Sequence, residues 1–201
     1  MRALPGGHVT IAMILATAYL LGSVPASYIV AFIWTGGRDI HHIGDGNPGV
    51  MNVWDNIGLA PALVAAAGDI GKGTAAVGLA YWVSDSHTLA MFAGLAAVIG
   101  HDYSVFLRFK GGNGTATTVG AWFGLVPLAA FAAITLTAVL FFATRRKRFS
   151  GFVGLTSVPF IAFAMGEPNE LTLGVVLLLA ALAAKIFSFE GLSPARSRIN
   201  R

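Results

Sequence analysis

The segment Thr117 to Ala143, TTVGAWFGLVPLAAFAAITLTAVLFFA, decides how this chain crosses a membrane. As one continuous helix it would put the basic residues before it and those after it on opposite sides of the bilayer. As two passes broken near Pro127, it puts both groups on one side, as the positive-inside tendency favours. Two full crossings need ~60 Å of helix and this segment supplies only ~40 Å. One of the two passes should therefore be short, tilted or covered by its neighbours.

The composition is that of a polytopic helical membrane protein. Of 201 residues, 56% are hydrophobic and 11% are charged, and the mean hydropathy is +0.74. We expect an all-α transmembrane bundle forming one integral membrane domain over residues 1–201. No Cys is present, which excludes a disulfide framework, a thiolate nucleophile and a cysteine zinc site. The first apolar run is too long for a signal-peptide core. The apolar segments other than 117–143 are 9–34, 57–83, 88–106, 149–165 and 171–189.

Charge placement predicts seven spans, with the N-terminus outside and the C-terminus in the cytoplasm. Asp85, Glu167 and Glu170 would then lie outside. We expect a multi-pass protein of the inner (plasma) membrane whose polar loops face the cytoplasm. The basic residues that this arrangement places in the cytoplasm are Arg38, Arg108, Lys110, residues 145–148, Arg196, Arg198 and Arg201.

The run RFKGGNGTAT, from Arg108 to Thr117, has the features of an anion site. Its glycines and asparagine can turn several backbone N–H groups inward, and it adds two cations and two hydroxyls. A phosphate at a membrane surface is the ligand that this combination favours. The alternative is a basic, glycine-rich loop that only connects two spans. The residues of this predicted site are Arg108, Lys110, Gly111, Gly112, Asn113, Gly114, Thr115 and Thr117.

Other polar groups accompany this run. The loop Gly36 to Gly58 is too polar to face lipid. Asp69 and Lys72 lie three residues apart in the next span, where ionisable groups usually face a cavity or one another. They form either part of a site or a structural pair that closes the bundle. His101, just past an apolar span, is either a hydrogen-bonded end cap or a base.

The order of these motifs resembles the bacterial acyl-phosphate:glycerol-3-phosphate acyltransferases, the PlsY family. The motifs are GSVPASYIVA from Gly22, GGRDI and GDGNPGVMNV in the first loop, D-x-x-K-G from Asp69, and GH…VFLRFKGGNGTAT from Gly100. The resemblance covers nearly the whole chain. It implies seven transmembrane helices and a cytoplasm-facing site that transfers an acyl group from acyl phosphate to glycerol 3-phosphate. The product would be lysophosphatidic acid, and neither metal, cofactor nor CoA thioester is needed.

The resemblance also assigns roles. His101 and Asn47 are the catalytic residues that it implies, and the asparagine amides would orient the second substrate. Asp45, which departs from the family pattern, is the third predicted catalytic residue. Binding the phosphate, aligning the hydroxyl and stabilising the oxyanion can supply much of the rate without a covalent intermediate. Besides the glycine-rich run, the residues predicted to bind substrate or phosphate are Asn52, Lys72, Asp69 and Arg38.

Several positions depart from the family pattern, and each departure removes positive charge, adds negative charge or removes a base. Asp45 replaces a serine and, as a carboxylate, could act as general base or simply cap its loop. His41 and Asp55 each replace an arginine, and Asn113 replaces a lysine. The C-terminal R-H-R-x-N-I motif is absent, with residues 188–190 in its place.

These losses leave several functions open. The chain is an acyltransferase on the usual substrates, an acyltransferase with a less anionic acceptor, or a non-catalytic relative that binds lipid or a partner helix. Transport is disfavoured because the polar residues lie in loops rather than at mid-membrane. The expected partners are acyl phosphate, glycerol 3-phosphate or a similar acceptor, and membrane lipids, without nucleic acid. The sequence does not predict an oligomeric state.

Overall fold

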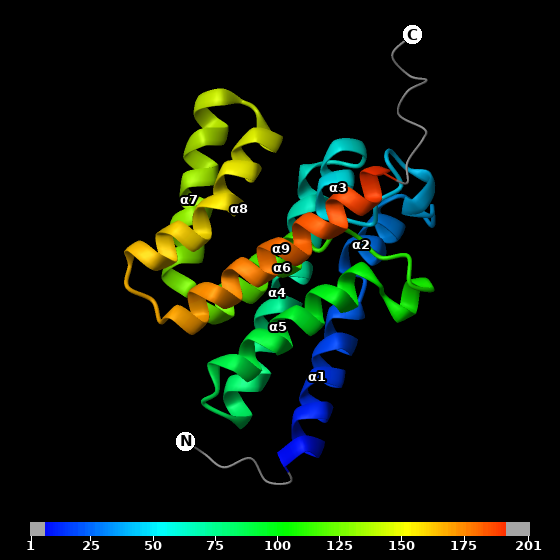
Figure 1. The fold of residues 1–201 in the computed structure, drawn as a ribbon. Helices are drawn as coiled ribbons and strands as arrows, with labels where there is room; N and C mark the ends of the chain where they lie inside the picture. The colour runs from blue at the N-terminus through cyan, green and yellow to red at the C-terminus, as the bar shows by residue number, and fades with distance from the viewer. Residues whose placement is uncertain (1–6, 192–201) are drawn as a thin grey trace.

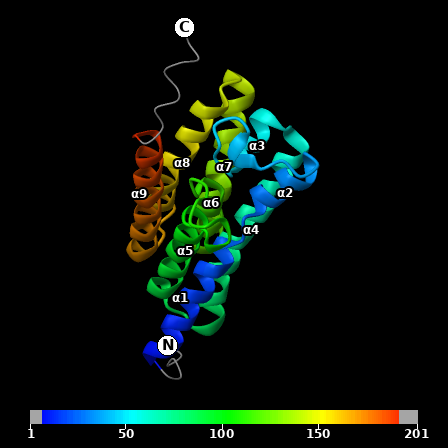
Figure 2. The same ribbon diagram turned by 90° about the vertical axis from the view of Figure 1, so that its right-hand side faces the viewer.

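The computed structural model describes residues 7–191, and every regular element in that range is helical (Figures 1 and 2). The long helices lie side by side as a bundle, with short helices in the loops. The elements are α1 (Gly7–Ser23), α2 (Ala26–Trp34), η1 (Ile40–His42), α3 (Val50–Asn56), α4 (Leu59–Val83), α5 (His87–Asp102), η2 (Val105–Leu107), α6 (Thr115–Leu125), α7 (Pro127–Thr144), α8 (Lys147–Ala164) and α9 (Asn169–Gly191).

Five segments of the described chain are long and apolar enough to cross a membrane. The predicted all-helical membrane fold is therefore confirmed. The predicted count of seven depends on α6 and α8, which are not among these five, and it stays a prediction. The five segments are Gly7–Trp34, Leu59–Val83, His87–Leu107, Pro127–Thr144 and Asn169–Ser188. Arg196, Arg198 and Arg201, on which the C-terminal charge prediction rests, lie outside the described residues.

The predicted break at Pro127 is present. Val126 leaves the helical conformation with φ −137° and ψ 66°, and Pro127 starts α7 at a position where its missing N–H has no helical partner. The preceding helix α6 spans only ~16 Å, about half of the hydrocarbon thickness. It packs closely against α4, because any side chain at Gly73 or Gly120 would overlap a carbonyl of the other helix. The short pass is thus covered by a neighbour.

The first apolar segment, expected as one span, is interrupted at Pro25. Helix α1 ends at Ser23 and α2 begins at Ala26. Proline cannot donate a backbone hydrogen bond, so carbonyls of the preceding turn lose their helical partners. Here the Ser23 carbonyl accepts from Ser104 Oγ at 2.6 Å, and the Val24 carbonyl accepts from Lys72 Nζ at 2.7 Å. The break provides acceptors for polar groups of two other elements.

The first loop, expected to be too polar to face lipid, contains regular structure. It contains the 3-10 helix η1 and the helix α3. Ile40 and Val53 are fully buried and form a small apolar cluster with Ala31, Ala62 and Ala65 of the flanking helices. This packing holds the loop against the ends of α2 and α4, where the polar residues gather.

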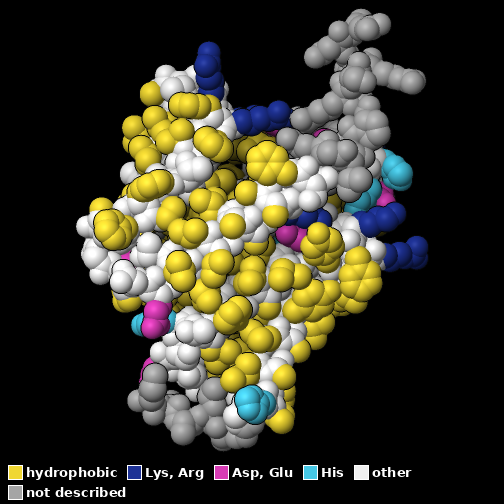
Figure 3. Space-filling model, viewed as in Figure 1, with side chains coloured by type: hydrophobic (Ala, Val, Ile, Leu, Met, Phe, Trp, Pro, Cys, Tyr) yellow, Lys and Arg dark blue, Asp and Glu magenta, His cyan; other side chains and the backbone are white. Residues whose placement is uncertain are grey.

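The outer surface of the bundle is apolar. Large side chains such as Trp82, Phe160 and Phe163 are more than 70% exposed. In Figure 3 the yellow hydrophobic surface covers most of the visible face, while Lys and Arg side chains gather in its upper half. An apolar exterior of this extent fits a surface solvated by lipid chains.

Candidate active site

Two loops that are far apart in the sequence meet at one end of the bundle. The first loop, residues 36–58, contacts the glycine turn, which we define as residues 108–114. His41 Nε2 lies 3.0 Å from the Lys110 carbonyl oxygen. The Gly112 N–H donates to the His101 carbonyl at 3.2 Å, which ties the turn to the end of α5. Most of the predicted site residues are therefore brought together.

The glycine turn packs too tightly to accept side chains. A Cβ at Gly111 would overlap the His101 carbonyl. A Cβ at Gly112 would overlap His101 Nε2 and lie 3.2 Å from the Pro48 carbonyl and 3.3 Å from Asn47 Oδ1. Groups from both loops thus converge on Gly112. Glycine is required here for space.

The glycine turn leads into the N-terminus of α6. Gly114 is the N-cap, with φ 69°, and no side chain caps the helix. The first N–H groups of a helix have no partner within it, and the helix dipole favours an anion there. Thr117 Oγ1 and Asn113 Oδ1 are buried and have no hydrogen-bond partner among the described residues. This end of α6 has the polar groups that a phosphate or an acceptor hydroxyl would use.

The cations predicted to bind phosphate lie at the rim. Lys110, Arg108 and Arg38 all have exposed side chains. The backbone at Arg108 and Phe109 is left-handed, with φ 53° and 64°. Two successive non-glycine residues in this region are strained, and such strain persists only where surrounding contacts hold it. The turn that carries Lys110 is therefore held in place by its neighbours.

Asp69, Lys72 and His101 form a buried polar network. Lys72 Nζ lies 2.8 Å from Asp69 Oδ1, 2.8 Å from His101 Nδ1 and 2.7 Å from the Val24 carbonyl. Ser27 Oγ donates to Asp69 Oδ2 at 2.5 Å. An ammonium has three N–H donors, and here three acceptors surround it. The contacts with Val24 and His101 are hydrogen bonds, whereas the contact with Asp69 is an ion pair that leaves Asp69 Oδ1 without a hydrogen-bond partner among the described residues.

With Lys72 as an ammonium, the network favours one tautomer of His101, although Nδ1 also lies 3.5 Å from Asp69 Oδ1. Because Nδ1 accepts from Lys72, the ring proton of the neutral imidazole lies on Nε2. Nε2 is the atom that faces Gly112. His101 therefore presents a hydrogen-bond donor, rather than a base, to the space beside the glycine turn. Its predicted catalytic role is geometrically possible as a donor to a developing negative charge.

The two predicted asparagines have different environments. Asn52 donates to the carbonyls of Ile43 and Asn47, both at 2.9 Å, and its Oδ1 accepts from Asn56 at 2.7 Å. These bonds use its amide within the first loop. Asn47 Oδ1 is buried without a partner among the described residues, and it faces Gly112. The Asn47 side chain thus has an unpaired acceptor beside the glycine turn, whereas the hydrogen bonds of Asn52 support the first loop.

Asp45 is the predicted base with the least direct access to the site. Its Oδ1 accepts from the Asn47 N–H at 3.1 Å, the loop-capping bond that was its alternative role. The residue is exposed and does not line the cavity described below. Its use as a general base stays a prediction.

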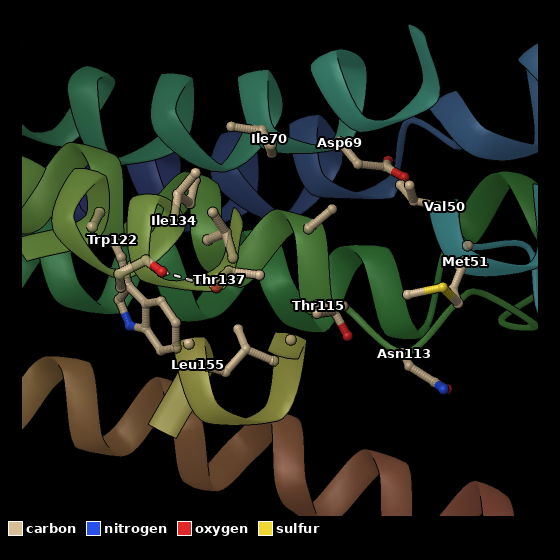
Figure 4. Close-up of a pocket in the computed structure, with 18 of the residues that line it drawn as sticks. Val50, Met51, Asp69, Ile70, Asn113, Thr115, Trp122, Ile134, Thr137 and Leu155 are labelled. Atoms are coloured by element: carbon tan, nitrogen blue, oxygen red, sulfur yellow. Dashed lines mark hydrogen bonds between the residues drawn. The ribbon is translucent and has the colours of Figure 1, made fainter. Parts of the chain in front are cut away.

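A cavity of about 350 Å³ begins at this polar end and runs into the bundle (Figure 4). Val50, Met51, Asn113 and Thr115 lie at one end of the view, and Trp122, Ile134, Thr137 and Leu155 lie at the other. The inner part is lined mainly by apolar side chains of α6, α7 and α8. The polar lining residues are Asn47, Asp69, His101, Asn113, Thr115 and Thr137.

The negative charge at Asp55 is neutralised by α8. Its carboxylate pairs with Lys147 and lies 4.0 Å from Arg148. Lys147 Nζ also lies 4.9 Å from the centre of the Trp54 ring. The family pattern has an arginine at position 55, and this chain has an aspartate there. Because Lys147 and Arg148 of α8 lie beside its carboxylate, Asp55 is not an unpaired negative charge.

Sequence reasoning missed the partners that come from distant elements. Ser27 was part of a quoted motif but had no assigned role, and the α8 wall of the cavity, including Gly151 and Gly154, was not anticipated. A serine among apolar residues or a glycine in a helix carries no local signal that names its partner. Only the packing of α2 and α8 reveals these roles.

Comparisons with known proteins agree with this geometry. The family model described as glycerol-3-phosphate acyltransferase matches residues 12–190. The glycerol-3-phosphate acyltransferase of Trichlorobacter lovleyi is 33% identical over 171 residues, 85% of this chain and 87% of the relative. That of Parasynechococcus marenigrum is 37% identical over 173 residues, 86% of this chain and 80% of the relative.

Solved structures show the same fold. The crystal structure of PlsY, an integral membrane glycerol 3-phosphate acyltransferase, in its glycerol 3-phosphate form has a TM-score of 0.80 and 27% identity, with 90% of each chain covered. Its lysophosphatidic acid form has a TM-score of 0.79, with the same identity and coverage. Together with the family match over most of the sequence, these findings show that this chain belongs to the glycerol-3-phosphate acyltransferase family.

Proposed function

We propose that this membrane enzyme transfers an acyl group from acyl phosphate to the hydroxyl of glycerol 3-phosphate. The observation that carries the proposal is the cavity whose polar mouth, at Asn47, Asn113 and Thr115, continues into an apolar interior. A fatty acyl phosphate has the same two parts in the same order. The acyl chain would occupy the space between α6, α7 and α8, and its phosphate would lie at the glycine turn.

The reaction needs few protein groups. The acceptor hydroxyl oxygen bonds to the acyl carbon, and the bond from that carbon to the phosphate oxygen breaks with its electron pair on the departing phosphate. The hydroxyl proton passes to that phosphate or to Asp45. The His101 Nε2–H and the N-terminus of α6 would stabilise the negative charge that develops. Lysophosphatidic acid and inorganic phosphate result.

Family membership supports the acyltransferase reaction, since the relatives named above are glycerol-3-phosphate acyltransferases. The pairing of Asp55 with α8 favours the ordinary anionic acceptor, because it removes one of the apparent repulsive charges. Lys110 and Arg108 would supply the remaining positive potential at the rim. Lys72 would position His101, and Asp69, which pairs with Lys72, would also line the substrate cavity.

Purified protein supplied with glycerol 3-phosphate should convert acyl phosphate faster than acyl-CoA or acyl carrier protein donors.

The variant Gly151→Leu should shift the preference of the enzyme toward shorter acyl chains. Gly151 lines the cavity and nothing lies within 4 Å of a Cβ placed there, so a leucine would project into the chain-binding space. The measurement is kcat/KM for short and long acyl phosphates.

The matched control for this experiment is Gly78→Leu. Gly78 is an exposed helical glycine outside the cavity, also with open space around its Cβ position. This variant should keep the parent's chain-length preference. If Gly151→Leu and Gly78→Leu had the same dependence of kcat/KM on chain length, the cavity would not be the acyl-chain site. If the protein transferred acyl groups only from acyl-CoA, acyl phosphate would not be the donor.

We also propose that the chain crosses the inner (plasma) membrane seven times, with the N-terminus outside and the site in the cytoplasm. Asp55 pairs with Lys147, so the turn between α7 and α8 lies at the same end as the first loop. The glycine turn contacts that loop through His41. Placing the basic groups of this end in the cytoplasm satisfies the positive-inside tendency.

Single cysteines introduced at Arg108, Arg146 and Glu167 test this orientation. The chain has no native Cys, so each thiol reports one position. A membrane-impermeant maleimide added to intact cells should label Glu167→Cys only. It should label the other two variants only in inside-out vesicles. Opposite sidedness of the Arg108 and Arg146 probes would contradict the seven-span arrangement.

A further inference from the structure

His41 bridges the two loops of the site through both of its ring nitrogens. Nδ1 lies 2.8 Å from Asp39 Oδ1, and Nε2 lies 3.0 Å from the Lys110 carbonyl oxygen. A carboxylate and a carbonyl oxygen are both acceptors, so each contact needs an N–H on the ring. A neutral imidazole has only one N–H. Both hydrogen bonds therefore exist together only when the ring is an imidazolium.

Asp39 is arranged to hold this cation. Its Oδ1 also accepts the backbone N–H of His41 at 2.9 Å, which fixes the carboxylate as the N-cap of η1. That backbone bond holds the pKa of the Asp39 carboxyl below its usual range, so the carboxylate stays ionised at neutral pH. The ring of Tyr28 on α2 packs against the imidazole, with centroids 5.8 Å apart.

The other contact of His41 falls on the strained part of the glycine turn. Lys110 follows Arg108 and Phe109, both left-handed, and its carbonyl directly precedes Gly111. Backbone bonds from Phe109 to Ser104 and from Lys110 to Leu107 hold the turn from the α5 side. From the first loop, the His41 hydrogen bond holds the turn at Lys110, next to the packing of Gly112 against Asn47 and Pro48.

We propose that His41, doubly protonated, is a positioning residue that links Asp39 to the Lys110 carbonyl and so holds the glycine turn in its phosphate-binding shape. This inference rests on the proposed function for its catalytic readout. The link weakens as pH rises, because a ring that loses one proton keeps only one of its two bonds. A guanidinium at this position would keep its donors at any such pH, since arginine stays charged.

The surroundings of the ring limit other sources of pH dependence. The titratable or charged groups near the ring are Asp39, the N-cap of η1, His42 on η1 and Tyr28 on α2, and Lys110 of the glycine turn contributes its backbone carbonyl. His42 is exposed, follows His41 directly in η1 and has an electrostatic effect on Asp39. It therefore offers a matched control.

The test compares kcat/KM for acyl phosphate in the parent and in His41→Arg between about pH 5 and pH 8, where an imidazole changes charge. Both enzymes meet the same substrate ionisation, so their ratio isolates position 41. We expect the parent to fall relative to His41→Arg by about tenfold as pH rises, with most of the change in KM. At low pH the two should be similar.

Variants that remove one or both donors complete the comparison. Glutamine has one N–H donor group, so His41→Gln can bond to either Asp39 or the Lys110 carbonyl. Its KM for acyl phosphate should match that of the parent at high pH and should not improve as pH falls. His41→Phe should raise KM by about 10- to 100-fold. His42→Phe should behave as the parent does. A flat ratio between parent and His41→Arg, or a parent-like KM for folded His41→Gln at low pH, would overturn the proposal.

Hydrogen exchange separates this inference from the function. Amides of residues 108–114, corrected for intrinsic exchange rates, should lose protection as pH rises in the parent but not in His41→Arg. If the parent transferred no acyl group while protection changed in this way, the proposed function would fail and the positioning role would stand. Protection that is the same in both proteins at every pH would overturn the positioning role, whatever the activity.

Discussion

Gly112→Val is expected to lower kcat/KM for acyl transfer by about 100- to 1000-fold, the loss associated with an oxyanion-stabilising donor. A Cβ at this position overlaps His101 Nε2 and lies 3.3 Å from Asn47 Oδ1, so the branched side chain would occupy the point where we propose that the substrate binds. Lys110→Ala removes only a positive charge at the rim of the site. This variant should lower kcat/KM by about 10- to 100-fold, chiefly by raising KM.

Steady-state kinetics and thermal unfolding in detergent measure both effects. Gly71→Val is the control, because Gly71 is an exposed helical glycine with open space at its Cβ position. It should lose no activity beyond a small helix-propensity effect. Parent-like turnover by a folded Gly112→Val protein would show that the glycine turn is only a connector.

The second large effect is expected at the buried ion pair. Asp69→Leu should lower the free energy of unfolding by about 3–5 kcal/mol, because it leaves the Lys72 ammonium buried without its partner. Asp69 is fully buried, and Lys72 is 8% exposed, so water can replace little of the lost interaction. Activity should also fall, since Lys72 no longer holds His101 Nδ1 in the same position.

The double variant Asp69→Leu with Lys72→Met separates stability from catalysis. Replacing both charges by apolar groups should restore most of the unfolding free energy. It should not restore kcat, because His101 would lack the donor that orients its ring. Thermal unfolding and kcat/KM are measured on the same preparations. A stable and fully active double variant would mean that the Asp69–Lys72 pair has only a structural role in the bundle.

Local sequence determined the features that depend on neighbouring residues. The apolar runs predicted a helical membrane protein, and Pro127 predicted the break between α6 and α7, because its ring excludes the helical conformation at Val126. The i, i+3 spacing placed Asp69 and Lys72 on one side of a helix, facing a cavity or one another, and the structure shows them as an ion pair. Pro25 interrupts the first span for the same reason. The prediction of one continuous span over residues 9–34 did not take this proline into account.

The site itself was predicted as a set of residues rather than as a geometry. The motif order brought Asn47, His101 and the glycine turn into one list, and the packing of their loops places them together. Their separate tasks were not evident. Lys72 was expected to bind substrate, and the structure adds that its ammonium donates hydrogen bonds to Val24, between α1 and α2, and to His101 of α5.

Tertiary structure alone decided the contacts between distant elements. His41 meets Lys110, Ser27 meets Asp69, and Asp55 meets Lys147 only because the helices that carry them pack together. Hydropathy and turn propensity act over a few residues, so they determine where helices form and end. Which side chains then face one another depends on helix rotation and on close approaches at small residues, and neither is encoded by local spacing.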